Sequence, residues 1–93
     1  MKKILLENIE YEVIRENKNA LNIEELTHLF TDYFYDFDYI LGDYAYNKLR
    51  LKGFCKKENK KWNKINDFEK IEEYIKKYCA YECKYFVIEK KKK

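Results

Sequence analysis

The pattern of hydrophobic and polar positions divides this chain into strands with a period of two and helices with a period near 3.6. Apolar residues alternate with glutamates from Ile9 to Val13, which predicts a first strand. Two further strands are predicted at about residues 38–42 and 48–55, on either side of a turn that is rich in Gly, Asp and Asn. A last strand is predicted at residues 84–89.

Two helices are predicted between these strands. The apolar stripe of the first helix consists of Leu26, Leu29, Phe30, Tyr33, Phe34 and Phe37. Asn22 stands at its N-cap, and Glu25 follows three residues later in the capping-box position. The second helix begins near Asn66 or Asp67, after a polar loop over residues 56–66.

The order β-α-β-β-α-β predicts an α+β protein with the ferredoxin-like fold. In that topology four antiparallel strands take the order 4-1-3-2, and both helices cover one face of the sheet. The other face is then left open. Because no repeat or Gly/Ser/Pro linker interrupts the chain, we expect one domain over residues 1–93, with an ordered core at about 7–89 and a lysine tail at 90–93.

Composition is that of a small folded protein. Hydrophobic residues make up 46% of the chain and aromatic residues 18%, so a modest core is sufficient. No apolar run approaches the roughly 20 residues of a membrane helix, and the run Ile4–Leu6 is too short for a signal peptide. Three cysteines, an odd number, are expected to be thiols in a reducing compartment. A cytoplasmic protein without a membrane partner is therefore expected.

The charge of the chain is distributed unevenly. Residues 1–47 carry a formal charge of −6 and residues 48–93 carry +9, which gives the net charge of +3. Such an asymmetry indicates either an anionic partner for the basic half or mutual neutralisation of the two halves in the fold.

The segment Gly42–Phe54, GDYAYNKLRLKGF, resembles the central motif of the YutD-like family of small Firmicutes proteins. A second matching segment is Tyr78–Cys83, followed by Tyr85–Val87. With the first strand and helix, the resemblance covers nearly the whole chain. The chain departs from the family pattern at Tyr44-Ala45 and at Cys55, which places Cys55 outside any shared site. The resemblance implies no activity, cofactor or partner, because none is established for that family.

Lys48, Arg50 and Lys52 form the first candidate binding site. Strand side chains alternate, so the three cations lie on the face opposite Leu49 and Leu51. On an open sheet they would pair with RNA phosphates while aromatic rings stack on bases, as in RRM-type modules. The leading hypothesis is therefore a binding module for RNA or a ribonucleoprotein.

Cross-strand ion pairs offer a different role for the same cations. In the predicted strand order the first strand lies beside the third, so that Glu10 and Glu12 would face Arg50 and Lys52. Each pair would contribute roughly 0.2–1 kcal/mol. Lys48 has no such partner, so both interpretations stay open.

The turn residues Asp43, Tyr44, Tyr46 and Asn47 form the second candidate binding site. Asp and Asn suit a tight turn, which is a structural role. Two tyrosines exceed what a turn needs, which indicates recognition. With Tyr85, they would also serve a protein–protein adaptor, which is the alternative function.

Cys79 and Cys83 are weak candidates for a metal or thiol regulatory site. Their C-x3-C spacing is allowed for zinc, but a single pair is half a site. The predicted topology brings this pair to the 42–47 turn near Arg15, and a shared family site is expected at that edge. Neither an enzyme nor a cofactor is expected, because this edge has no nucleophile–base pair, Gly-rich phosphate loop or carboxylate pair.

Overall fold

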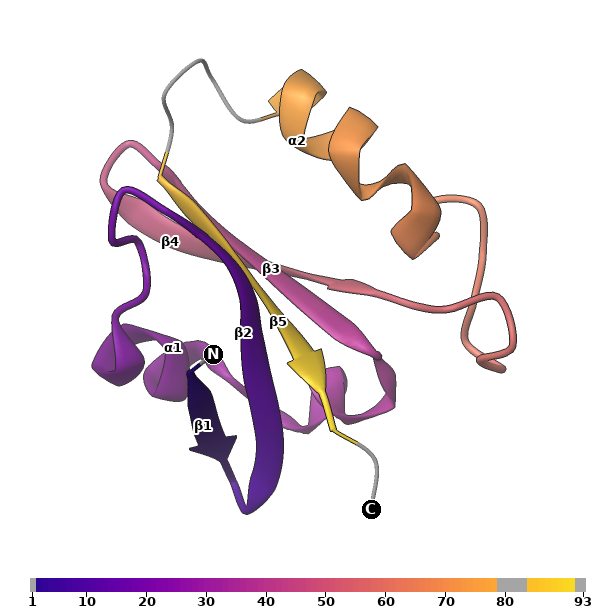
Figure 1. The fold of residues 1–93 in the computed structure, drawn as a ribbon, viewed down its shortest axis with the longest axis horizontal. Helices are drawn as coiled ribbons and strands as arrows, with labels where there is room; N and C mark the ends of the chain where they lie inside the picture. The colour runs from indigo at the N-terminus through magenta and orange to yellow at the C-terminus, as the bar shows by residue number, and fades with distance from the viewer. Residues whose placement is uncertain (1, 79–83, 92–93) are drawn as a thin grey trace.

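The computed structural model describes residues 2–78 and 84–91, which form one antiparallel sheet with helices on it (Figure 1). The elements are β1 (Lys3–Leu6), β2 (Ile9–Asn17), α1 (Ile23–Leu29), the 3-10 helix η1 (Asp32–Asp36), β3 (Tyr39–Ala45), β4 (Lys48–Phe54), the 3-10 helix η2 (Phe68–Lys70), α2 (Ile71–Tyr78) and β5 (Tyr85–Lys90). The strand order is β1-β2-β5-β3-β4, so β5 is central and β1 and β4 are the edges. The α+β class is confirmed.

The sheet differs from the predicted one in its strands and their order. β1 is an additional strand, joined to β2 by a two-residue turn in which Glu7 and Asn8 have φ of 51° and 71°. β5 pairs with β2 on one side and β3 on the other, whereas the ferredoxin-like order places the last strand at an edge. Phe86, Val87 and Ile88 are each 0% exposed, and a strand that is apolar on both faces needs the cover that a central position gives. The predicted order 4-1-3-2 is therefore wrong.

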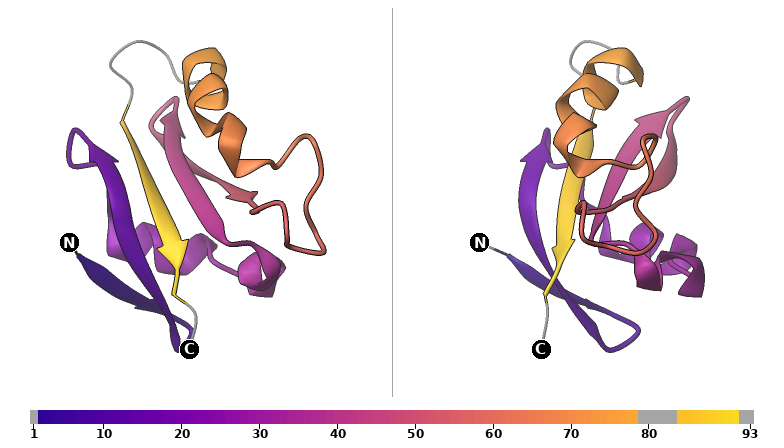
Figure 2. Two further views of the ribbon diagram at one scale, coloured as in Figure 1. Left: turned by 45° about the vertical axis from the view of Figure 1, so that its right-hand side comes forward. Right: turned by 90° about the vertical axis from the view of Figure 1, so that its right-hand side faces the viewer.

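The two helices cover opposite faces of the sheet, not one face as predicted (Figures 1 and 2). Phe86 and Ile88 of β5 belong to the hydrophobic cluster that includes residues of α1 and η1. Val87, which points to the other face, belongs to a second cluster with residues of η2 and α2. Within residues 2–78 and 84–91, both faces of the sheet therefore carry a hydrophobic cluster and a helix. The open face that the RNA hypothesis assumed is not there.

Local sequence signals give the start of both helical segments. The side chain of Asn22 accepts a hydrogen bond from the Glu25 N–H at 3.2 Å, as the capping box predicts. The predicted stripe is divided between α1 and η1, because Phe30 has an extended backbone between them. At the second segment the Asp67 side chain accepts from the Glu69 N–H at 3.0 Å, and η2 then continues into α2.

The folded part extends further at its carboxyl end than the sequence predicts. Lys90 belongs to β5, and Lys91 Nζ lies 2.8 Å from a Glu12 carboxylate oxygen. Among the helices of the described residues, none has the length and apolar character needed to cross a membrane. Cys79 and Cys83 lie outside the described residues.

Candidate functional site

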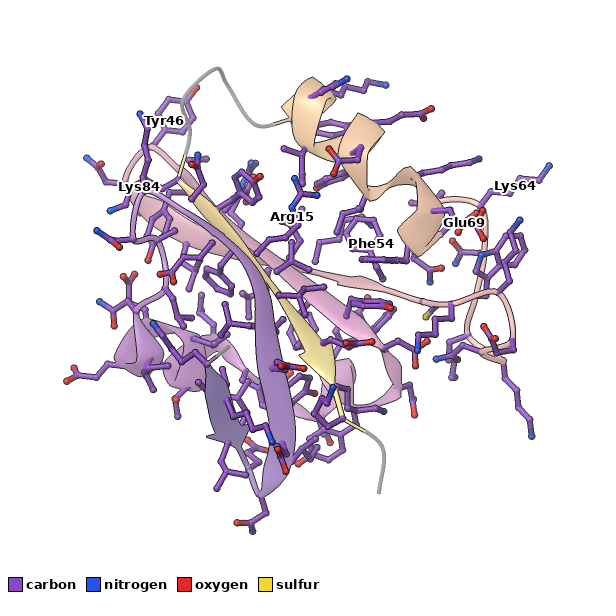
Figure 3. All side chains as sticks on the ribbon, in the orientation of Figure 1. Arg15, Tyr46, Phe54, Lys64, Glu69 and Lys84 are labelled. Carbon is purple, nitrogen blue, oxygen red and sulfur yellow. The ribbon has the colours of Figure 1, made fainter. Side chains whose placement is uncertain are left out.

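The β3–β4 hairpin turns over only two residues, Tyr46 and Asn47, with φ of 53° and 64°. Positive φ at both positions gives a two-residue turn whose twist matches that of the flanking strands. Asn adopts a positive φ readily, whereas a tyrosine with positive φ is uncommon. Tyr46 is 99% exposed and projects from the tip of the hairpin (Figure 3). Asp43 and Tyr44, which were predicted as turn residues, belong to β3 instead.

Asp43 and Arg50 form a two-pronged ion pair across the hairpin. They are directly opposite in the register of β3 and β4. Arg50 donates from Nε to Asp43 Oδ1 at 3.2 Å and from Nη2 to Oδ2 at 2.7 Å. The Asp43 side chain is 8% exposed, so the guanidinium neutralises a carboxylate that would otherwise be buried alone. Its hydrogen bonds with Asp43 in turn raise the pKa of Arg50.

The predicted pairing of Glu10 and Glu12 with Arg50 and Lys52 is wrong, because β5 separates β2 from β3 and β4. Glu12 lies 2.8 Å from Lys91 Nζ, and Glu10 lies 3.5 Å from a lysine of β1. Arg50 is neutralised nonetheless, by its neighbour in the hairpin. A turn placed at residues 46–47 would have given this partner from the sequence, since it sets residues 43 and 50 opposite each other.

Lys48 and Lys52 have no carboxylate partner in the part of the chain that the structure describes. Lys52 Nζ lies 5.3 Å from the ring centroid of Phe54 and 5.5 Å from that of Tyr74, which is a cation–π arrangement. Burial lowers the pKa of Lys52. Lys48 is exposed at the start of β4. The predicted cationic strand thus consists of two lysines on either side of a neutralised arginine.

A groove of about 590 Å³ runs along β4, which is within the usual size range of ligand sites. Its lining includes Arg50 and Lys52 of β4, Tyr33 of η1, Phe37, Ile65 and Tyr74 of α2. Tyr33 and Ile65 are 66% and 78% exposed, so apolar surface adjoins the cations. Ile65 was not predicted as a functional residue and Tyr33 was predicted in a helix stripe, since neither position has a periodic signal for this groove.

Polar side chains hold the loop that forms one wall of the groove. Asn66 accepts from the Asn63 N–H at 2.9 Å and donates from Nδ2 to the Lys61 carbonyl at 3.0 Å. Asn59 Nδ2 donates to the carboxylate of Asp38 at 3.0 Å. These hydrogen bonds hold the loop in place beside β4.

Two of the three tyrosines proposed for an adaptor surface are already engaged. The Tyr44 hydroxyl donates to Glu25 at 3.1 Å, and the Tyr85 hydroxyl accepts from Arg15 at 3.0 Å. Arg15 also pairs with a glutamate of α2 and lies between the sheet and that helix (Figure 3). Of the three, only Tyr46 is classed as exposed.

The predicted meeting of the 42–47 turn with residues 79–83 falls partly outside the described residues. Lys84 does lie beside the hairpin: its carbonyl accepts from the Tyr44 N–H at 3.3 Å, and its Nζ lies 5.0 Å from the Tyr44 ring centroid. The role of Cys79 and Cys83 stays a prediction.

The one cysteine in the described residues, Cys55, is fully buried, and burial raises the pKa of its thiol. Over residues 2–78 and 84–91, no three His, Cys, Asp or Glu side chains are placed to hold a metal ion.

The fold and the β4 edge define a small α+β protein with a cationic edge strand beside a partly apolar groove. Residues 5–89 match the family model described as "Putative antitoxin YutD-like". The chain belongs to this YutD-like family, and the resemblance seen in the Gly42–Phe54 motif is confirmed.

Two comparisons extend over the whole chain. It is 37% identical over 90 residues to the putative antitoxin YutD of Bacillus subtilis (strain 168), which covers 97% of this chain and 99% of that relative. It is also similar to the solution NMR structure of protein yutD from B. subtilis, with a TM-score of 0.82 and 35% identity. That alignment covers 100% of this chain and 84% of the other.

Proposed function

We propose that this chain is a non-enzymatic binding protein of the antitoxin kind, which neutralises a toxin protein by direct contact through the β4 edge. Full-length similarity to a protein named as a putative antitoxin supports this class of function. The observation that carries the proposal is the distribution of surface chemistry. Both faces of the sheet are occupied by the chain's own helices, whereas the β4 edge has lysines with no carboxylate partner among the described residues, and a groove with exposed apolar side chains lies beside it.

The same observation ranks the proposal above RNA binding. Stacking of bases on a sheet needs an open aromatic face, and the helices occupy both faces here. Of the three cations of β4, Arg50 is held by Asp43 and Lys52 lies against two rings. Contact with RNA or a ribonucleoprotein through Lys48, Arg50, Lys52 and the adjoining turn stays a prediction.

A genetic test decides whether the chain acts as an antitoxin. We expect that the gene for this chain can be deleted from the native host only if a second gene, which encodes the toxin, has lost its function. Expression of that second gene alone then arrests growth, and co-expression of this chain restores it. If the gene can be removed without any effect on growth and without a second mutation, the proposal is wrong.

A biochemical test separates a protein partner from RNA. The purified pair should stay together after nuclease treatment, and its affinity should fall with salt much less steeply than that of an RNA complex, because a complex with several phosphate contacts loses about 10³–10⁵ in affinity between 50 and 200 mM salt. A complex that nuclease dissolves would instead support the RNA hypothesis.

A further inference from the structure

We infer that the outer edge of β4 binds an extended segment of the partner as a sixth strand, and that acidic and apolar side chains alternate along this segment. The inference rests on the proposed function for the partner being a protein. It adds the binding mode and the chemistry of the segment that is recognised.

Backbone groups at three positions of β4 face away from β3. The two-residue turn makes Ala45 and Lys48 a hydrogen-bonded pair, and such pairs then recur at every second position of the hairpin. The N–H and C=O groups of Leu49, Leu51 and Gly53 therefore point outward. No strand of the described residues pairs with them, because β4 is an edge of the sheet. Free groups of this kind are the template for addition of a strand.

The chain's own elements bound this edge at both ends. Near Lys48 and Leu49, α1 flanks a second hollow of about 480 Å³. Beyond the other end, Cys55 forms an isolated bridge with Asp67. Phe54 is 1% exposed, and Gly53 is buried but lines the groove, so the accessible length is about residues 48–53, which is an ordinary length for a strand.

The charges along β4 select the occupant. Lysines protect an edge strand from indiscriminate pairing, and the same lysines attract an acidic segment. A second copy of this chain fits poorly. In antiparallel pairing that sets Leu49 opposite Leu51 of the second copy, Lys48 would lie opposite Lys52, which is a like-charge contact. An acidic segment would place carboxylates at these positions.

The opposite face of β4 favours apolar residues between the acidic residues of the partner segment. Leu49 and Leu51 point to that face and pack on the α1 cluster. Leu29 and Tyr33, which line the same two hollows, are 40% and 66% exposed. Since side chains of an added strand also alternate between faces, every second residue would contact this apolar surface.

Amide hydrogen exchange of the isotope-labelled protein tests the binding mode. The probe is a capped octapeptide of alternating Glu and Val, with an alternating Lys–Val peptide and a peptide of four Glu followed by four Val as controls. We expect only the Glu–Val peptide to slow exchange at Leu49, Leu51 and Gly53, by roughly tenfold or more at saturation. The alternate amides of β4 already bond to β3 and should not change. Equal protection by the block peptide, or none at these three amides, would overturn the inference.

Paired charge reversals test the selection by charge. Lys48→Glu with Lys52→Glu should weaken binding of the Glu–Val peptide roughly tenfold or more, since two attractive contacts become repulsive. Lys60→Glu with Lys76→Glu changes the net charge equally at exposed positions outside β4 that line neither hollow, and it should leave affinity within about twofold. Equal losses in the two variants would contradict the inference. Protection of the three amides by dimerisation without peptide would also contradict it, in favour of a second copy.

The growth test separates this inference from the function on which it rests. If both the natural chain and the Lys48→Glu, Lys52→Glu variant restore growth, the binding mode is wrong while the antitoxin function stands. If the natural chain restores nothing, the antitoxin function is wrong, and the exchange data alone decide whether the edge binds acidic segments.

Discussion

Gly42→Ala tests the packing at the centre of the sheet. Gly42 is opposite Phe86 in the register of β3 and β5. A Cβ at this position would lie within 2.8 Å of three atoms of the Phe86 ring, and that ring is 0% exposed. The glycine is therefore required by this close approach and not by its backbone, since no glycine of the described residues has positive φ.

The magnitude follows from how little the ring can move. Overpacking of a core costs about 1–3 kcal/mol, and replacing a strand glycine by alanine returns about 0.5–1 kcal/mol. Because Phe86 belongs to the central strand and is held by the α1 cluster, we expect the upper part of this range. A net loss of about 2 kcal/mol corresponds to a fall in Tm of about 8–16 °C.

Gly53→Ala is the matched control. A Cβ there would lie within 2.6 Å of three atoms of the Phe37 ring, which is an equally close approach. Phe37 is only partly buried and lies beside the groove, so its ring can turn aside. We expect a loss below about 1 kcal/mol for this variant.

Thermal and urea unfolding, followed by circular dichroism, measure both effects. The double variant Gly42→Ala with Phe86→Leu should lose about 1 kcal/mol less stability than the sum of the two single losses, because the smaller side chain at residue 86 makes room for the new methyl group. The reasoning is refuted if the two losses simply add, or if Gly42→Ala is as stable as the natural chain.

Three other predictions concern stability and burial. The buried Tyr11 hydroxyl has no hydrogen-bond partner in the described residues, so Tyr11→Phe should be neutral or stabilising by up to about 1 kcal/mol in urea unfolding. Burial raises the pKa of Tyr11 from 10.0 to about 12, so the unfolded chain loses this proton first and stability falls as pH rises from 10 to 12; the variant should reduce that fall. Asn22→Ala should lower the free energy of unfolding by about 1 kcal/mol through loss of the α1 cap. Asn22→Asp should keep most of the stability that this cap contributes. Cys55 should resist alkylation in the folded protein and react in denaturant, which peptide-resolved mass spectrometry measures; rapid labelling without denaturant would contradict its burial.

Local signals were enough to predict most elements of the fold. Alternation gave the four longer strands to within a few residues, and the cap at Asn22 gave the start of α1. β1 was missed because four residues carry too little periodic signal. The strand order was wrong because element order alone does not determine it. Phe86, Val87 and Ile88 held the decisive signal, a run that is apolar on both faces and so belongs at the centre of the sheet.

Alternation predicted where the candidate cations lie on β4, but not what they contact. Lys48, Arg50 and Lys52 do share one side of β4, as alternation requires, and Arg50 and Lys52 line the groove. The partner of Arg50 was missed because it depends on the exact position of the turn. The aromatic wall of the groove comes from η1 and α2, which only the packed structure brings to β4.

The central place of β5 has a consequence for how the chain is made. β1 with β2, and β3 with β4, are hairpins that can form locally, but only β5 joins them into one sheet. Since β5 is the last strand in the sequence, the five-stranded sheet cannot be completed until synthesis reaches residue 90. Until then both hairpins present unpaired inner edges to chaperones and proteases. Loss of the final strand would therefore leave two separate hairpins and not a smaller version of the same domain.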